Sequence, residues 1–201
     1  MPNSLILLYK KEERRISYAE KKQIILSELD TALSGINADD AEFLAEALCG
    51  GGKVFVIGVG RVMLMLQAFA KRMNHLGIPA NYVGAIDEPA ITEGDVLLVG
   101  SGSGETAVPV AIAKIAQRYE AKVIHIGANP RSTMTEYENV FIRIPCATKL
   151  SLPNEVASQQ IMSSLFEQSL LLFLDAVAMM VAEKKGIRDL HTLWRYHANL
   201  E

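Results

Sequence analysis

The chain has 201 residues, of which half are hydrophobic, and its formal net charge is −3 with a pI near 5.9. This length suffices for one domain with a sizeable core, and the lack of a basic balance argues against a nucleic acid partner. The two cysteines, Cys49 and Cys146, lie far apart without metal-ligand spacing, which predicts two buried thiols in a reducing compartment. The apolar run 5–8 precedes basic residues, the reverse of a signal peptide. We therefore expect a cytoplasmic protein.

Hydrophobic periodicity divides the chain into helices and short strands. In the first 50 residues, apolar positions recur at helical spacing and predict an amphipathic helix followed by a shorter one that ends at consecutive glycines. Beyond them, short runs rich in Val and Ile, bounded by Gly, Pro, Asn or Asp, alternate with helical segments. The predicted helices are 17–33, 39–48, 61–76, 107–119 and 159–185, with a short helical turn at 132–138; the predicted strands are 53–57, 80–83, 95–99, 122–126 and 140–144.

Strands that are apolar almost throughout and alternate with helices predict a parallel sheet that is covered on both faces. We expect an α/β fold with a doubly wound five-stranded parallel sheet in the flavodoxin-like order 2-1-3-4-5, formed by a single domain over residues 1–201. Ligands of such sheets bind beyond the carboxyl ends of the strands, where the winding reverses. The glycine turns at 58–60 and 100–104 both fall at that edge, so we expect them to be neighbours.

The last predicted helix is apolar over most of its circumference. A helix of this kind contacts more than one layer, which predicts contact with another subunit and hence a homo-oligomer. Glu167, Gln168 and Asp175 interrupt the apolar run, so a core or interface helix is favoured over a membrane span. We expect the amino-terminal helices, about 17–49, and the long helix with its tail, about 159–201, to lie at subunit interfaces.

The segment 100–106, with the sequence Gly-Ser-Gly-Ser-Gly-Glu-Thr, combines three glycines with three hydroxyl side chains between a predicted strand and a predicted helix. Glycines allow successive N–H groups to converge on one concavity, and the start of the helix adds free N–H groups and a positive dipole end. This pattern predicts a phosphate site, with a plain strand-to-helix turn as the alternative. No Lys follows as a nucleotide P-loop requires. The dinucleotide fingerprint is also absent, because Met63 and Glu105 occupy its third glycine position.

The segment 100–106 after an apolar strand resembles the phosphate loop of the SIS (sugar isomerase) domain family. Within that family, four further stretches resemble the 6-phospho-3-hexuloisomerases, and the similarity covers essentially the whole chain. They are 58–61 (Gly-Val-Gly-Arg), 71–77 (Lys-Arg-Met-Asn-His-Leu-Gly), 164–175 around Glu167, and 197–201 (His-Ala-Asn-Leu-Glu). The resemblance implies interconversion of D-arabino-hex-3-ulose 6-phosphate and fructose 6-phosphate in the ribulose monophosphate route of formaldehyde fixation. It also implies a tetramer that needs no cofactor, with sites near subunit boundaries.

The resemblance further implies a role for each matching residue. It assigns the phosphate to the loop, the sugar to the first glycine turn, proton transfer to a carboxylate, and a histidine to the site of an adjoining subunit. The residues so assigned are Ser101, Gly102, Ser103 and Thr106 for the phosphate, Gly60 and Arg61 for the sugar, and Glu167 and His197 for catalysis. Val62, Ile161 and Ser163 depart from the family pattern on the sugar side. We predict no metal site, because no carboxylates and histidines stand at ligand spacing.

Moving a carbonyl between neighbouring carbons requires a base that removes a proton from one carbon and returns it to the other. A Glu with its pKa raised toward neutrality by apolar surroundings suits this task, and Glu167 is flanked by apolar residues. The alternative is that Glu167 belongs to a capping box with Ser164. His197 titrates nearest neutral pH and could shuttle protons, or it could hold the carboxyl-terminal tail in place. Arg61 could bind sugar hydroxyls or phosphate, or be solvated.

Two other histidines have structural interpretations. His75 is expected to interact with the carboxyl end of its helix or with an interface, and His125, inside an apolar strand, is expected to be a hydrogen-bonded core residue. Two alternative functions remain open at this point. One is an isomerase of another sugar phosphate, and the other is a sensor that binds a phosphosugar without chemistry.

Overall fold

The computed structural model describes residues 16–197. The chain forms five α-helices, five strands and two short 3-10 helices over this range. In chain order they are α1 (Tyr18–Ser34), α2 (Ala38–Leu48), β1 (Val54–Ile57), α3 (Arg61–His75), β2 (Ala80–Tyr82), β3 (Val96–Gly100), α4 (Ala107–Arg118), β4 (Lys122–Gly127), η1 (Thr133–Glu136), β5 (Val140–Arg143), α5 (Ser164–Lys184) and η2 (Leu190–Tyr196). The predictions for the apolar run 5–8 and for the tail beyond His197 concern residues outside the described range.

The five strands form one parallel sheet in the order β2-β1-β3-β4-β5. The predicted fold class and strand order are therefore confirmed. The winding reverses between β1 and β3, which are hydrogen-bonded neighbours with Val54 opposite Val96 and Ile57 opposite Val99. Both strands are buried along their whole length, as expected for a sheet with two covered faces. Their carboxyl ends lead directly into the two glycine turns, which are therefore neighbours as predicted.

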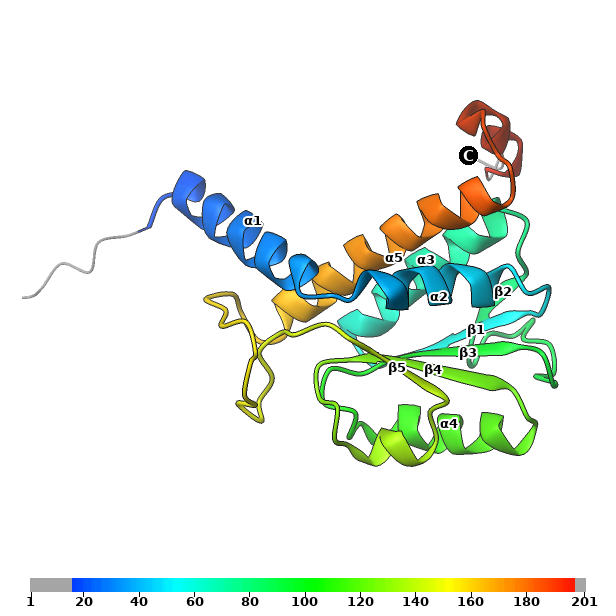
Figure 1. The fold of residues 1–201 in the computed structure, drawn as a ribbon, viewed down its shortest axis with the longest axis horizontal. Coiled ribbons are helices and arrows are strands. Elements are labelled where there is room, and N and C mark those ends of the chain that lie inside the picture. Colours follow the sequence, from blue (N-terminus) through cyan, green and yellow to red (C-terminus); the bar gives the residue numbers. More distant parts are fainter. Residues whose placement is uncertain (1–15, 198–201) are drawn as a thin grey trace, which may run out of the picture.

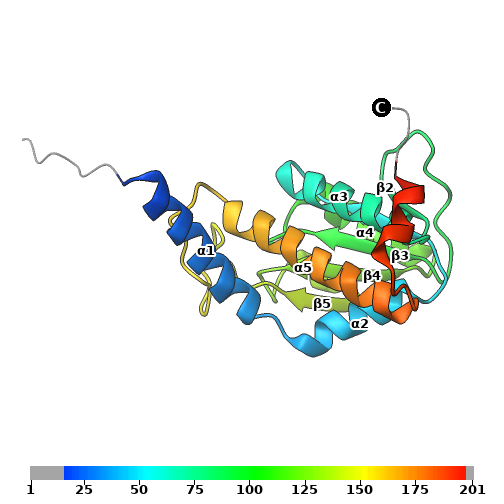
Figure 2. The ribbon, with the colours of Figure 1, turned by 90° about the horizontal axis from the view of Figure 1, so that it is seen from above.

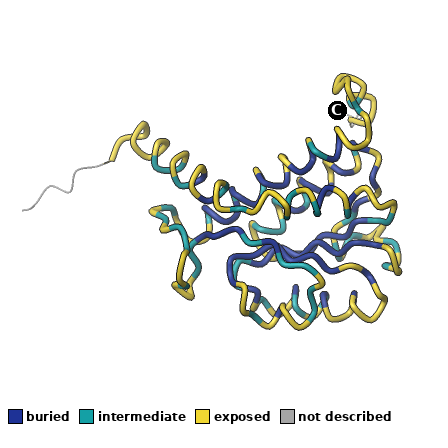
Figure 3. Tube along the Cα trace, viewed as in Figure 1, coloured by how far each residue is buried: buried dark blue, intermediate teal, exposed yellow. Residues whose placement is uncertain are grey.

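The two faces of the sheet are covered unequally. Helices α1, α2, α3 and α5 lie on one face, and α4 lies on the other (Figure 1). Seen from above, α5 runs between α3 on one side and α1 and α2 on the other (Figure 2). This layer forms the larger core, to which α5 contributes Leu170, Leu174, Val177 and Val181, all fully buried. The sheet strands and the inner side of this helix layer are the most buried parts of the chain (Figure 3).

The amino-terminal edge of β3 is fixed by a buried carboxylate. Asp95 accepts hydrogen bonds from the Lys53 amide at 2.7 Å and from the amide and hydroxyl of Thr92 at 2.8 and 2.9 Å, and the Lys53 ammonium lies 2.8 Å away. Burial acts to raise the pKa of Asp95, but these hydrogen bonds outweigh it and leave the pKa below its usual value. The carboxylate therefore joins β1 to the crossover before β3.

Three details of the predictions are corrected by the structure. Helix α5 begins at Ser164 rather than near 159, after a segment in which Met162 has a positive φ of 53°. Its N-cap is Ser163, which makes no side-chain cap hydrogen bond, so the alternative interpretation of Ser164 and Glu167 as a capping box is wrong. Cys146 is buried as expected, whereas Cys49 is exposed at the end of α2.

Helix α5 is also the one helix among residues 16–197 that is long and apolar enough to cross a membrane by length and composition. Most of this apolar length is packed into the larger core, as predicted for a core helix. Its exposed side nevertheless carries Leu172, Ala176 and Met179, spaced three to four residues apart. The helix is therefore buried over less of its circumference than the sequence predicts, and it leaves an apolar stripe on the surface.

Candidate active site

The loop between β3 and α4 turns four of its six carbonyl groups, those of residues 101–104, to one side. The segment after β4 supplies most of the hydrogen-bond donors to these carbonyls. The Gly102 carbonyl accepts from the amides of Ala128 and Asn129 at 2.9 and 3.1 Å. The Ser103 carbonyl accepts from the Asn129 side chain at 3.1 Å, and the Gly104 carbonyl accepts from the Met134 amide at 3.2 Å. The Ser101 carbonyl lies 2.9 Å from the His125 ring. In a trans peptide the N–H points opposite to the C=O of the same unit. The amides that follow these carbonyls are therefore turned away from β4.

Two of these amides, at Gly102 and Ser103, make no hydrogen bond among the described residues. Both residues are partly exposed, so their N–H groups can reach a ligand. Gly104 has a φ of +66°, and a Cβ there would come within 2.1 Å of the Ser132 hydroxyl. No other residue type fits this position without a shift, since the left-handed conformation and the close approach both require glycine.

The hydroxyl groups of the loop shape it from within. Ser101 is buried, and its hydroxyl accepts a hydrogen bond from the Gly104 amide at 3.1 Å and lies 3.2 Å from the Thr106 hydroxyl. The Ser103 hydroxyl accepts from the Glu105 amide at 3.2 Å. The structure thus brings Ser101, Ser103 and Thr106 together around one turn. Each hydroxyl already takes part in holding the turn.

Glu105 does not carry its charge into this turn. Its two carboxylate oxygens accept hydrogen bonds from the amide and hydroxyl of Thr133, at 2.9 and 2.6 Å. These two hydrogen bonds lower the pKa of Glu105 below its usual value, and the bond from the Thr133 hydroxyl has the larger effect. The carboxylate therefore joins the loop to η1 and is engaged away from the free amides.

Three helices begin around the loop without side-chain caps. The N-caps of α3, α4 and α5 are Gly60, Thr106 and Ser163, and none makes a side-chain cap hydrogen bond. By contrast, Ser17 and Asn37 cap α1 and α2 with their side chains. Uncapped helix starts leave N–H groups and the positive dipole end available to an anion. The three helix starts therefore add positive potential at the edge of the sheet where the loop lies.

The starts of α3 and α5 pack directly on the loop. A Cβ at Gly100 would lie 2.8 Å from Val62 and 3.4 Å from Leu170, and one at Gly102 would lie 3.6 Å from the Phe166 ring. A Cβ at Gly58 would also contact Val62, at 3.0 Å. Val62, which departs from the family pattern, is thus used to pack the two glycine turns together.

Glu167 follows Phe166 in the first turn of α5 and is only 7% exposed. Its Oε2 atom lies 2.6 Å from the Arg61 Nε atom at the start of α3, and the Arg61 side chain is 60% exposed. The Arg61 N–H is not directed at this oxygen, which makes no hydrogen bond among the described residues. The structure therefore brings Arg61 and Glu167 together.

His197 lies at the other end of α5. Its ring stacks on His75 with the ring centroids 5.9 Å apart and lies 5.4 Å from Trp194. The three side chains line a cavity of about 370 Å³ between α3, α5 and η2, which Ala178 also lines. Ala178 follows Glu167 by 11 residues, or about 17 Å of helix. Within one protomer the structure does not bring His197 and Glu167 together.

His75, which stacks on His197, has a pKa below its usual value. Burial is the largest cause, followed by the positive charges of Arg72 and Lys71 and by His197. The ring also lies at the carboxyl end of α3, as predicted. This cluster of basic side chains is separate from the loop of residues 100–106.

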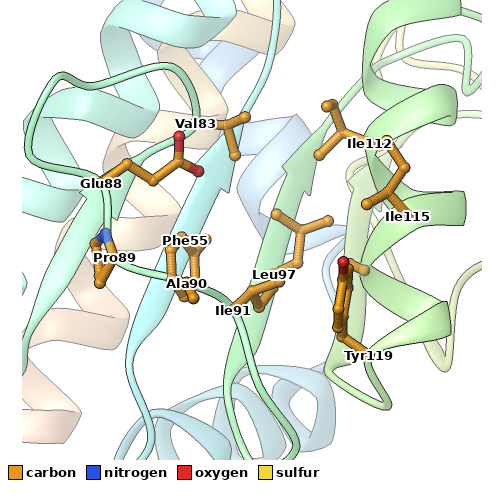
Figure 4. Close-up of a pocket in the computed structure, with 11 residues that line it drawn as sticks. Phe55, Val83, Glu88, Pro89, Ala90, Ile91, Leu97, Ile112, Ile115 and Tyr119 are labelled. Atoms are coloured by element: carbon orange, nitrogen blue, oxygen red, sulfur yellow. The ribbon is translucent and has the colours of Figure 1, made fainter.

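A second cavity of about 370 Å³ lies on the α4 face of the sheet, between β1, β3 and the crossover from β2 to β3 (Figure 4). Its lining is almost wholly apolar and includes Phe55, Ile91, Leu97 and Tyr119. None of the predicted site residues lines it. No cluster of three or more metal-ligating side chains occurs among residues 16–197.

Comparison with known proteins assigns the chain to a family. The family model of the SIS domain matches residues 48–177. The 3-hexulose-6-phosphate isomerase of Bacillus subtilis is 39% identical over 177 residues, which are 88% of this chain and 95% of that relative. The Mycobacterium gastri protein of the same name is 33% identical, covering 89% of this chain and 88% of its own. The chain therefore belongs to the SIS domain family.

A solved structure agrees with this assignment. A crystal structure from Methanococcus jannaschii, from which a molecular function of 3-hexulose-6-phosphate isomerase was inferred, has a TM-score of 0.77 and 26% sequence identity. The match covers 90% of this chain and 99% of that one. The predicted resemblance is confirmed, and the relatives place this chain among the isomerases of the family.

Proposed function

We propose that the protein interconverts D-arabino-hex-3-ulose 6-phosphate and fructose 6-phosphate. The observation that carries this proposal is the position of the buried Glu167, paired with Arg61, beside a loop whose free amides face a common side. A phosphate anchored by the loop leaves the sugar to extend toward the starts of α3 and α5. The names of the relatives support the same substrate pair.

The phosphate is proposed to bind the amides of Gly102 and Ser103 and the hydroxyls of Ser103 and Thr106, with Ser101 shaping the loop from beneath. A hydrogen bond to a charged oxygen contributes about 1.5–3 kcal/mol. Four such bonds, less the cost of ordering the ligand, give an affinity in the micromolar to millimolar range, since 1 μM corresponds to about −8 kcal/mol. This affinity suits a substrate that must also leave.

Glu167 is proposed to transfer the proton. Its carboxylate removes the proton from C2 of the 3-ketose, which gives an enediol across C2 and C3, and returns it to C3, while the hydroxyl proton at O2 passes to O3. The exposed Arg61 guanidinium is proposed to turn from Glu167 toward the sugar oxygens together with the amide end at Gly60. The base is then released from its ion pair only when substrate is bound.

His197 is proposed to act in the site of a neighbouring subunit of a cytoplasmic homotetramer, because it lies far from Glu167 of its own chain. The exposed apolar stripe of α5, with Leu172 and Met179, supports an oligomer. We propose one domain over the full 201 residues, a reaction without a cofactor, and a place in the ribulose monophosphate route.

The test is proton NMR of fructose 6-phosphate incubated with the protein in deuterated water. The proposal expects loss of the signal from the C3 proton together with the appearance of a 3-ketose. Exchange without a 3-ketose would assign the protein to another sugar-phosphate isomerisation. Binding of fructose 6-phosphate without exchange would contradict isomerisation of this substrate.

A further inference from the structure

His125 on β4 is fully buried, and both of its ring nitrogens face acceptors. Nδ1 lies 2.6 Å from Oε2 of Glu138, and Nε2 lies 2.9 Å from the carbonyl oxygen of Ser101. A carbonyl oxygen cannot donate a hydrogen bond, so Nε2 must carry a proton. A second proton must then lie between Nδ1 and the Glu138 carboxyl group. The pair therefore holds one proton more than a neutral imidazole beside a carboxylate.

We propose that this second proton resides on the ring, so that His125 is an imidazolium that positions the phosphate loop from beneath. Imidazole binds a proton about two pH units more tightly than a carboxyl group does, and the adjacent carboxylate compensates the charge of the ring. The pair is neutral as a whole, which reduces the cost of burying it. His125 never touches the substrate and is a positioning residue.

The surroundings of the ring contain no competing charge within ion-pair distance among residues 16–197. On the β5 side, the ring packs against Phe141 with centroids 5.1 Å apart. A Cβ at Gly127 would lie 2.5 Å from Nε2, and the Cβ at Gly104 would lie 3.2 Å from the ring and 2.1 Å from the Ser132 hydroxyl. Glu138 from the segment before β5 is thus the titratable partner of the ring.

The consequence for the loop follows from peptide geometry. The Ser101 carbonyl lies 2.9 Å from Nε2 of His125 and accepts a second, longer hydrogen bond from the Gly104 amide at 3.2 Å. Because this carbonyl is directed at Nε2–H, the Gly102 N–H of the same trans peptide points to the opposite side. That amide is one of the two free donors proposed to bind phosphate. The positive end of the His125–Glu138 pair is also the end nearest the loop. The inference rests on the proposed function only in that the loop holds a phosphate group.

The structural alternative is that both hydrogen bonds merely satisfy buried polar atoms. A neutral ring would serve that purpose if residue 138 could donate to Nδ1. Glu138→Gln supplies this donor: the Gln amide donates to Nδ1, Nε2–H still donates to Ser101, and only the charge is removed. This variant therefore separates the charge of His125 from its hydrogen bonds.

The experiment uses the full-length protein with ¹⁵N-labelled histidine. Ring-nitrogen NMR reports the protonation state directly, since both nitrogens of an imidazolium carry protons and have similar shifts. We expect an imidazolium at pH 7 in the wild type and a neutral ring in Glu138→Gln. We also expect inorganic phosphate to bind roughly tenfold more weakly to Glu138→Gln. KM for the sugar phosphate should rise by a similar factor while kcat stays within about twofold.

Phe141→Leu is the matched control, because it alters packing against the ring without removing a hydrogen bond, and it should leave phosphate affinity unchanged. A neutral ring in the wild type would overturn the inference. Unchanged phosphate affinity in a Glu138→Gln variant whose ring is neutral would overturn the role of the charge. If that variant fails to fold, the wild-type spectrum still decides. Absence of phosphate binding by the wild type would contradict the proposed function, whereas the spectrum would still test the pair.

Discussion

Asn129 offers a direct test of how the phosphate loop is held. This residue follows β4, is 4% exposed, and donates from its side chain to the Ser103 carbonyl at 3.1 Å. Its Oδ1 atom accepts from the Arg131 amide at 3.0 Å. Asn129→Ala removes both bonds and leaves two backbone groups without their partners. At about 0.5–1.5 kcal/mol for each bond, the variant should lose roughly 1–3 kcal/mol of stability.

Part of this loss should appear in ligand binding, because the Ser103 peptide is no longer fixed. We expect the affinity for inorganic phosphate to fall by a factor of about 10, which corresponds to about 1.4 kcal/mol. Isothermal titration calorimetry measures the affinity, and urea denaturation measures the stability. Phosphate affinity within twofold of the wild type would refute the role assigned to this side chain.

Asn139→Ala is the matched control for this experiment. The Asn139 side chain accepts from the Val123 amide at 2.7 Å, so it also joins a loop to β4. That bond lies at the amino-terminal end of β4, at the opposite edge of the sheet from the phosphate loop. The control loses one bond instead of two, so it should lose roughly 0.5–1.5 kcal/mol of stability and keep its phosphate affinity.

Three further predictions concern stability and reactivity. Asp95→Asn should cost about 2 kcal/mol of stability at pH 7. Because the pKa of Asp95 is lowered in the folded state, the stability that it contributes is present above its unfolded pKa and is lost as pH falls through its folded pKa. The denaturation curves of the variant and the wild type should therefore converge in acid, and curves that stay apart would contradict this prediction. Gly104→Ala should cost about 2–4 kcal/mol of stability and weaken phosphate binding. Gly186 also has a positive φ, of +68°, but lies in open space, so Gly186→Ala should cost only about 1 kcal/mol in the same denaturation assay. Equal costs would contradict the close approach at Gly104. Cys49 is exposed and should react with a thiol reagent in the native state. Cys146 should not react, because burial raises the pKa of its thiol to about 11. Rapid labelling of both cysteines would contradict the packing around Cys146.

The sheet could be predicted from the sequence because its signals are local. Each strand is a short apolar run between turn residues, and all five predicted strands lie within two residues of their observed bounds. The alternation of strands with helices then gave the parallel order. The start of α5 was misplaced because its boundary depends on the chain path through a positive φ at Met162, which periodicity does not reveal.

The site was predicted in part. The loop of residues 100–106 is recognisable because its glycines and hydroxyls are consecutive. Asn129 and Glu138 were missed, since Asn129 meets Ser103 only when β4 pairs with β3, and Glu138 meets His125 only when β5 pairs with β4. The one available signal was their position next to strands, with Asn129 just after the end of β4 and Glu138 just before the start of β5. The Arg61–Glu167 ion pair likewise joins two helix starts whose approach no spacing rule predicts.

The surroundings of Glu167 are less apolar than the sequence predicts, and its role as a base stays a prediction. The carboxylate is buried as expected, yet a guanidinium lies beside it. In the proposed mechanism, the substrate displaces Arg61 from Glu167. The assignment of His197 to a neighbouring site stays a prediction, which the separation of about 17 Å along α5 between Glu167 and the cavity of His197 in one protomer supports.

The most direct measurement of the central claim is the rate of C3 proton exchange of fructose 6-phosphate in deuterated water, compared between the wild type and Glu167→Gln. Glu105→Gln serves as the control, because its carboxylate is bonded to Thr133 and faces no free amide. We predict exchange by the wild type and the control, and none by Glu167→Gln, which should still bind the sugar phosphate with nearly unchanged affinity. Exchange by Glu167→Gln at the wild-type rate would contradict the account.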